Sequence, residues 1–141
     1  SLPAKNTPSV LLVIFALIFF TGWALSRGAN LQKYYFKKDP KRRFLWIEPE
    51  TISDGNTILL VNGFWGISRH INYLGEIIMA IGIVLATGHF SLFWPWLYPL
   101  YYVVLLFPRQ ADDNKRCAQK YGPLWDEYVK KVPYKIIPFI Y

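Results

Sequence analysis

The residues best suited to bind an anion begin with a pair of lysines. Lys33 and Lys37 stand four positions apart, so a helix would place both on one face. Two cations on one helix face are within reach of a phosphate-bearing ligand. The cations that follow, Lys41, Arg42 and Arg43, we interpret instead as the orienting charges of a lipid-facing basic loop.

A second group of polar residues flanks an apolar stretch. The segment NGFWGISRHINYLGE, residues 62–76, runs directly into the apolar sequence, and RQADD follows where that sequence ends. If the apolar sequence folds as a helical hairpin, its two ends meet. The candidate site residues on these two flanks are Arg69, Asn72, Tyr73, Arg109 and Asp113.

Each of these residues also has a purely structural explanation. Arg69 and Arg109 can extend their charged ends out of a membrane boundary. Asn72 is a favoured residue at the start of a helix, and Tyr73 suits an interfacial aromatic belt. Considered together with the lysine pair, however, they predict one anion-binding site lined by aromatic rings.

The elements that must position these residues are those of a membrane protein. The 141 residues are 53% hydrophobic and 18% charged, with a net charge of +7, and the charges are clustered. No charge lies between Lys5 and Arg27, and about 20 apolar residues are enough to cross a hydrocarbon core of about 30 Å. We therefore predict a transmembrane helix over residues 1–27; the alternative is a buried helix of a large soluble protein.

The rest of the chain divides into three parts. Residues 28–61 form a basic loop, which the positive-inside rule assigns to the cytoplasm. Residues 62–108 contain the motif segment and a helical hairpin, with arms at roughly residues 72–88 and 93–107. Residues 109–141 form a cytoplasmic tail with short amphipathic helices, broken at Gly122–Pro123. The predicted fold class is an all-α polytopic membrane helix bundle, with its N-terminus on the non-cytoplasmic side.

Several classes of site are excluded by what the sequence lacks. It has neither a Gly-x-Gly-x-x-Gly fingerprint nor a Walker loop. Cys117 is the only cysteine and the chain has two histidines, so no zinc pattern exists and we predict no metal site. The basic residues alternate with apolar spans, which argues against nucleic-acid binding through this segment.

The motifs carry a resemblance to a known family. GFWGISRHINYLGE, the C-terminal stretch LLFPRQADDNKRCAQKYGPLWDEYVKKVPYKIIPFIY and the upstream GANLQKYYFKKDP resemble, in this order, the C-terminal region of the NADPH-dependent sterol reductases. This family includes the Δ14-sterol reductases, the reductase domain of the lamin B receptor, and the C7 and C24(28) sterol reductases. The resemblance implies that the chain is the C-terminal part of a larger membrane protein and binds NADPH in a pocket that faces the cytosol.

The resemblance also assigns roles to individual residues. It implies that Lys33 and Lys37 meet the cofactor phosphates, and that Tyr128 lies near the sterol or donates a proton, with Asp113 as a second catalytic group. The family often has Arg where Lys37 stands, and Lys keeps the charge without the bidentate fork. The other residues implied to line the cofactor pocket are Trp65, Arg69, Asn72, Tyr73, Arg109, Asp113 and Tyr121.

The implied reaction is reduction of a sterol-ring double bond, with Δ14 the closest resemblance. The sterol would enter from the bilayer, and membrane lipids would surround the spans. Eukaryotic members would lie in the endoplasmic reticulum or inner nuclear membrane, and bacterial members in the cytoplasmic membrane.

Two other functions stay open. The stretch RHINYLG is similar to the Arg-His-Pro-x-Tyr-x-Gly stretch of the isoprenylcysteine carboxyl methyltransferases, which bind S-adenosylmethionine, although Ile71 replaces their Pro. The lamin B receptor shows that the same architecture can accompany a non-catalytic role, in which the protein binds sterol or anchors a membrane.

Overall fold

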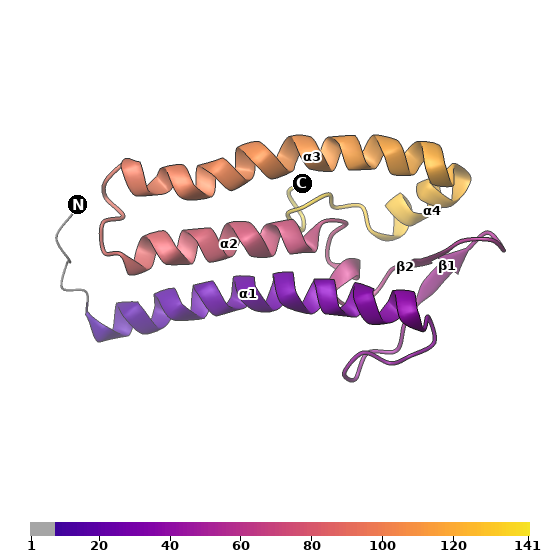
Figure 1. The fold of residues 1–141 in the computed structure, drawn as a ribbon, viewed down its shortest axis with the longest axis horizontal. Helices are drawn as coiled ribbons and strands as arrows, with labels where there is room; N and C mark the ends of the chain where they lie inside the picture. Colours follow the sequence, from indigo (N-terminus) through magenta and orange to yellow (C-terminus); the bar gives the residue numbers. More distant parts are fainter. Residues whose placement is uncertain (1–7) are drawn as a thin grey trace.

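The fold is built from three long helices that lie side by side (Figure 1). The computed structural model describes residues 8–141, so residues 1–7 of the predicted span lie outside the described part. The helices are α1 (Ser9–Lys38), α2 (Ile71–Ala86) and α3 (Leu97–Tyr121), and the short α4 (Pro123–Lys131) follows. Two 3₁₀ turns, η1 (Gly63–Gly66) and η2 (Trp94–Trp96), precede α2 and α3. The predicted all-α class is confirmed.

Helix α1 is longer than predicted. Within the described residues it is the one helix long and apolar enough to cross a membrane, whereas α2 is apolar but shorter. α1 continues to Lys38, so the segment expected to be a loop from residue 28 begins as helix. Asp39 then takes an extended conformation because the following Pro40 disfavours helical backbone before it.

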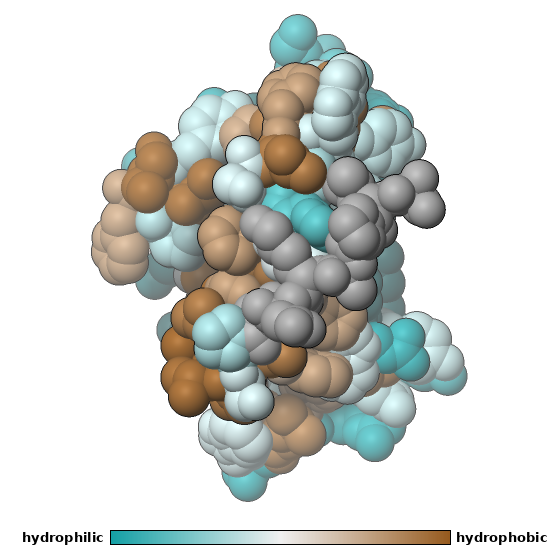
Figure 2. Space-filling model, turned by 90° about the vertical axis from the view of Figure 1, so that its left-hand side faces the viewer, coloured by the Kyte–Doolittle hydropathy of each residue, from teal (hydrophilic) through white to brown (hydrophobic). Residues whose placement is uncertain are grey.

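The turn between α2 and α3 and the break in the tail both lie at glycine- or proline-containing stretches. α2 ends at Ala86 and α3 begins at Leu97, which leaves the turn in the TGHFSLFWP stretch. Figure 2 views the molecule from the end at which α2 and α3 are joined, and it shows apolar residues (brown) at the surface between more polar ones (white and teal). Gly122 has a φ of 56°, a left-handed conformation that suits glycine, and Pro123 starts α4.

Two local features differ from the prediction. α3 runs without interruption past Pro108, so the boundary expected before Arg109 is not the end of a helix. Strands β1 (Thr51–Ser53) and β2 (Ile58–Leu60) form a small antiparallel sheet, with Ile52 opposite Leu59. An Asp54-Gly55 pair between the strands is a hairpin signal that the helical prediction did not use.

Helices α1 and α2 lie in very close contact. A Cβ added to Gly75 would lie 2.6 Å from the Gly22 carbonyl oxygen and 2.5 Å from the Ser26 backbone nitrogen. Such a contact is too short for any side chain, so glycine is required at this crossing. Beside it, the Ser26 hydroxyl donates a hydrogen bond to Glu76 Oε1 at 2.7 Å.

The C-terminal segment folds back onto the start of α2. The backbone N–H groups of Arg69 and His70 donate to the carbonyl oxygens of Tyr134 and Lys135, each at 2.9 Å. Tyr141 stacks on Phe107 with ring centroids 5.3 Å apart. The tail therefore fixes the backbone of the motif segment from which the candidate site is built.

Candidate functional site

A cavity of about 240 Å³ lies between the C-terminal part of α1, strand β2, the motif segment, α3 and α4. It collects many of the predicted site residues from segments far apart in the sequence. The predicted residues that line it are Lys33, Lys37, Trp65, Arg69, Tyr121 and Tyr128. Among residues 8–141 no carboxylate lines the cavity, so three basic side chains face it without an acidic one.

Trp65 forms a fixed wall of the cavity. Its side chain is buried, and the indole N–H donates a hydrogen bond to the Ala29 carbonyl oxygen at 2.8 Å. Lys33 Nζ lies 4.7 Å from the centre of the Trp65 ring, within cation–π range. The ring therefore positions the Lys33 ammonium at the cavity.

Arg69 is a buried cation without a counter-ion. Its side chain is 6% exposed, and the guanidinium Nε is buried with no hydrogen-bond partner. Arg69 takes part in neither of the two ion pairs formed by residues 8–141. Its guanidinium carbon lies 5.8 Å from the centre of the Trp125 ring. Burial lowers the pKa of Arg69, which reflects the cost of desolvating the charge, although Tyr128 and Tyr141 oppose the shift. An anion in the cavity would complete this site.

His70 contributes an uncharged ring. Burial is the main cause that lowers the pKa of His70 to about 4; Asp113 opposes the shift, while Lys33 and Arg69 add to it. The imidazole is thus neutral at pH 7. It stacks on Tyr73 with ring centroids 4.7 Å apart, so His70 connects the cavity wall to the side chains behind it.

Tyr128 is a buried phenol on α4. Burial raises the pKa of Tyr128 to about 12, while the nearby Arg69 lowers it. The hydroxyl therefore keeps its proton at neutral pH. The Trp125 ring lies 4.9 Å from the Tyr128 ring and 6.2 Å from the Tyr121 ring, so three aromatic side chains form a row along this wall.

The remaining predicted residues lie outside the cavity lining. Tyr73 donates a hydrogen bond to Asp113 Oδ2 at 3.1 Å, and Asp113 pairs with Arg116 at 3.3 Å. Asn72 donates to Asn30 Oδ1 at 3.3 Å. Arg109 is exposed on α3. The structure thus brings Tyr73 and Asp113 together, as the predicted meeting of the hairpin ends requires, but outside the cavity lining.

Several lining residues were missed from the sequence. His70 and Cys117 line the cavity, although their sequence pattern predicts no role for either at this site. Trp125 had a usable signal, because Tyr121, Trp125 and Tyr128 follow three- and four-residue spacing across the helix break. The other lining residues are Phe36 on α1 and the residues of β2. Their place in the cavity depends on how the β-hairpin packs beside α1, which no local pattern reveals.

The arrangement suits a ligand with phosphate groups and flat rings. Lys33, Lys37 and Arg69 supply positive charge, and the buried unpaired Nε of Arg69 is a free donor for an anionic oxygen. Trp65 and Trp125 add large aromatic side chains to the cavity lining. None of the described residues forms a cluster that could hold a metal ion.

Comparisons with known proteins agree on one family. The family model described as "Ergosterol biosynthesis ERG4/ERG24 family" matches residues 2–141. The chain is 43% identical over 130 residues to the Delta(14)-sterol reductase of Arabidopsis thaliana, which covers 92% of this chain and 34% of that protein. It is 44% identical over 130 residues to the Delta(14)-sterol reductase TM7SF2 of Mus musculus, covering 92% of this chain and 31% of that protein.

A third relative carries a different name. The chain is 38% identical over 133 residues to the "Probable 7-dehydrocholesterol reductase" of Acanthamoeba polyphaga mimivirus, covering 90% of this chain and 30% of that protein. The chain therefore spans about a third of the length of the curated relatives it matches.

Proposed function

Because this chain belongs to the ergosterol biosynthesis ERG4/ERG24 family, we propose that it forms the NADPH-binding part of a membrane sterol reductase. The proposed reaction is reduction of a ring carbon–carbon double bond in sterol biosynthesis. Δ14 is the proposed position because relatives with 36–44% identity are named Delta(14)-sterol reductase. The mimivirus relative makes C7 the alternative position.

The observation that carries the proposal is the unpaired Arg69 guanidinium beside Lys33 and Lys37. NADPH has three phosphate groups, and its adenine and nicotinamide rings are flat. We assign the phosphates to the three basic residues and the rings to the faces of Trp65 and Trp125. Lysine at position 37 gives a point charge instead of the fork that arginine would provide.

The chemistry divides between cofactor and protein. NADPH, when bound, supplies the hydride. Tyr128 is the proposed proton donor to the alkene, because its buried hydroxyl is protonated at neutral pH. The positive charge of Arg69 stabilises the phenolate that remains. The proton adds to one alkene carbon, and the hydride adds to the other, which has become a carbocation.

Asp113 has a supporting place in this proposal. Its carboxylate accepts the Tyr73 hydroxyl, and the Tyr73 ring stacks on His70 at the cavity wall. We therefore assign to Asp113 the positioning of Tyr73 and His70 behind the cofactor, in addition to its predicted part in proton supply.

The direct test is a ligand titration of the purified full-length gene product. NADPH, NADH and S-adenosylmethionine are each titrated, and binding is followed by calorimetry. We expect NADPH to bind and Arg69→Gln to weaken it at least about tenfold, because a charge-assisted hydrogen bond is worth about 1.5–3 kcal/mol. The matched control is Arg43→Gln, which removes an exposed arginine outside the cavity lining.

Two results would contradict the proposal. Binding of S-adenosylmethionine alone would favour a methyltransferase. NADPH binding that Arg69→Gln leaves unchanged would place the cofactor elsewhere. If NADPH binds as expected, a second experiment identifies the bond that is reduced. The protein is incubated with a Δ14-sterol and a Δ7-sterol, and the products are analysed by mass spectrometry. Reduction of neither sterol would support a non-catalytic role.

A further inference from the structure

The segment between α1 and β1, residues 39–50, contains a tight apolar turn at residues 44–47, here called the tip. Phe44 and Ile47 pair across it, with N–H···O distances of 3.0 Å and 2.8 Å. Between them, Leu45 is 62% exposed and Trp46 is 79% exposed. Leu45 has a φ of 56°, a left-handed conformation that leucine rarely adopts. The backbone therefore turns so that two large apolar side chains point away from the protein.

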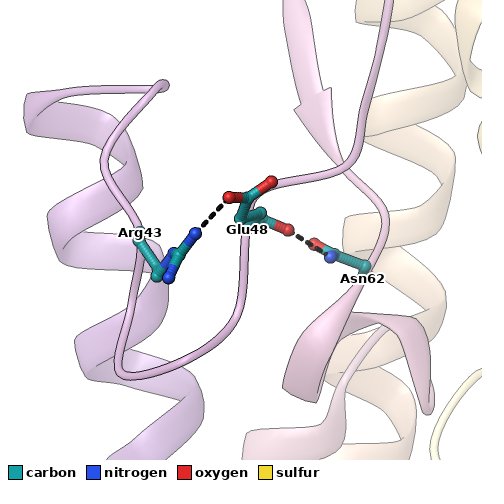
Figure 3. A network of polar contacts seen from close by, with 3 residues as sticks. All are labelled: Arg43, Glu48 and Asn62. Atoms are coloured by element: carbon teal, nitrogen blue, oxygen red, sulfur yellow. Dashed lines mark hydrogen bonds and ion pairs between the residues drawn. The ribbon is translucent and has the colours of Figure 1, made fainter.

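A polar network holds this tip in place. Figure 3 shows Arg43 paired with Glu48 across the turn, and Asn62 reaching the same segment from the residues before η1. The Asn62 amide donates to the Glu48 carbonyl oxygen at 2.6 Å and accepts the Glu50 N–H at 3.0 Å. The exposed tip is thus part of a fixed structure that continues into β1.

The segment bends back beside the polar end of α1 (Figure 1). The Phe44 ring lies 6.2 Å from the Tyr35 ring of α1 and 6.4 Å from the Phe64 ring. Tyr35 is about 12 Å along the helix from Arg27, where the charge-free stretch of α1 ends. A lipid headgroup layer extends about 5–8 Å beyond the hydrocarbon core. A tip that points back from Tyr35 therefore lies near the headgroups when α1 crosses a membrane.

The charges around the tip favour an acidic surface. Five basic residues and three acidic residues lie between 37 and 50, and the basic ones all precede the tip. Glu48 is paired with Arg43. Arg42 is an exposed residue whose guanidinium lies over the Tyr35 ring. Tryptophan concentrates at membrane interfaces, and Lys and Arg near a membrane are attracted to anionic lipids.

We propose that residues 39–50 form a membrane-docking loop for an anionic leaflet. Leu45 and Trp46 enter the headgroup region, and Lys41 and Arg42 bind lipid phosphates. The loop fixes the height of the cavity above the bilayer, because β2, which follows it, forms part of the cavity lining. This inference concerns the membrane surface and does not depend on which ligand the cavity binds.

The test measures the depth of Trp46 in the full-length protein. The protein and its Trp46→Phe variant are placed in phosphatidylcholine nanodiscs with or without phosphatidylserine, and the fluorescence difference isolates Trp46. A headgroup nitroxide lipid is expected to quench this difference signal at least about twofold more than a nitroxide deep in the acyl chain, because tryptophan prefers the interface. Phosphatidylserine should increase the quenching, and the Lys41→Gln/Arg42→Gln variant should lose that increase.

The control is Trp94→Phe, at the other end of the molecule, whose difference signal should be the same with and without the Lys41→Gln/Arg42→Gln substitutions. Circular dichroism verifies that each variant is folded. A Trp46 signal that no nitroxide lipid quenches would overturn the proposal: a blue-shifted signal would mean that protein covers the tip, and a red-shifted one that it lies in water. Quenching that is independent of phosphatidylserine would also overturn the anionic part of the proposal.

Discussion

Along residues 22–26, α1 lies so close to α2 that backbone atoms face one another. Along residues 33–37 the same helix borders a cavity. In the first region Gly22 and Gly75 leave no room for a side chain, and the buried residues are small. In the second region Lys33, Phe36 and Lys37 project toward the aromatic side chains of α4.

The difference separates two tasks within one helix. Close packing of small residues fixes the relative position of α1 and α2, because any displacement would bring backbone atoms into collision. Large aromatic and cationic residues at the cavity do not pack to the same density and leave a desolvated charge. The first region thus stabilises the frame, and the second uses that stability to hold a ligand site.

The largest effect is expected from Gly75→Val. The added atoms would collide with the backbone of Gly22 and Ser26, so we expect a loss of about 3 kcal/mol in unfolding free energy. Detergent-induced unfolding followed by circular dichroism measures it. Ala86→Val, at the exposed last residue of α2, is the control and should change the stability by less than about 0.5 kcal/mol. Equal stability of both variants would show that α1 and α2 are not in backbone contact.

The next effect is a pH dependence that arises at the cavity. The folded protein holds the pKa of His70 at about 4, below the ordinary value of about 6.5 that applies to histidine in the unfolded chain. Between these values the unfolded chain takes up a proton that the folded protein does not, so stability falls as the pH is lowered from about 6.5 to 4, by up to about 3 kcal/mol.

His70→Gln should remove this part of the pH dependence. Thermal unfolding of the two proteins from pH 4 to pH 9 is the measurement. Above pH 7.5 the two curves should run parallel, which serves as the internal control. If both proteins lose the same stability on acidification, His70 is not desolvated at the cavity wall.

A smaller effect with an unusual sign is expected at Arg69. Replacing the unpaired buried cation by methionine should increase the unfolding free energy by about 1 kcal/mol, because the desolvation cost disappears and a long unbranched apolar side chain takes its place. The measurement is unfolding in the absence of ligand. Arg43→Met, which removes an exposed ion pair, should change the stability by less than about 0.5 kcal/mol. A large loss at Arg69 would indicate that its guanidinium is already paired in the protein.

The smallest effect is expected from Lys37→Arg. A guanidinium fork binds phosphate with two hydrogen bonds, so NADPH should bind about threefold more tightly. Lys38→Arg, whose side chain lies over Tyr34 and outside the cavity lining, is the matched control and should leave the affinity unchanged. Weaker binding of the Lys37 variant would place the cofactor phosphates away from this helix face.

Several elements could be predicted because their signals are local. The charge-free run predicted α1, the break at TGHFSLFWP predicted the hairpin, and Gly122–Pro123 predicted the end of α3. The end of α1 at Lys38 and the continuation of α3 past Pro108 were harder to predict from the sequence. Where local signals are weak, tertiary packing decides whether a helix continues. The small β-sheet had a local signal, the Asp54-Gly55 pair, but the basic composition of the segment led to the prediction of a loop.

The sequence by itself determined the family, the helical class and the identity of the cations that a phosphate ligand needs. The family follows from the resemblance of the motifs, whereas the helical class and the cations follow from residue types and from spacing along single helices. Only the tertiary structure decided which side chains share the cavity: Arg69, His70 and Trp125 line it, whereas Asp113 and Asn72 lie outside its lining. The physical reason is that the rotation of each helix, and the pairing of the C-terminal tail with Arg69 and His70, depend on contacts between distant segments.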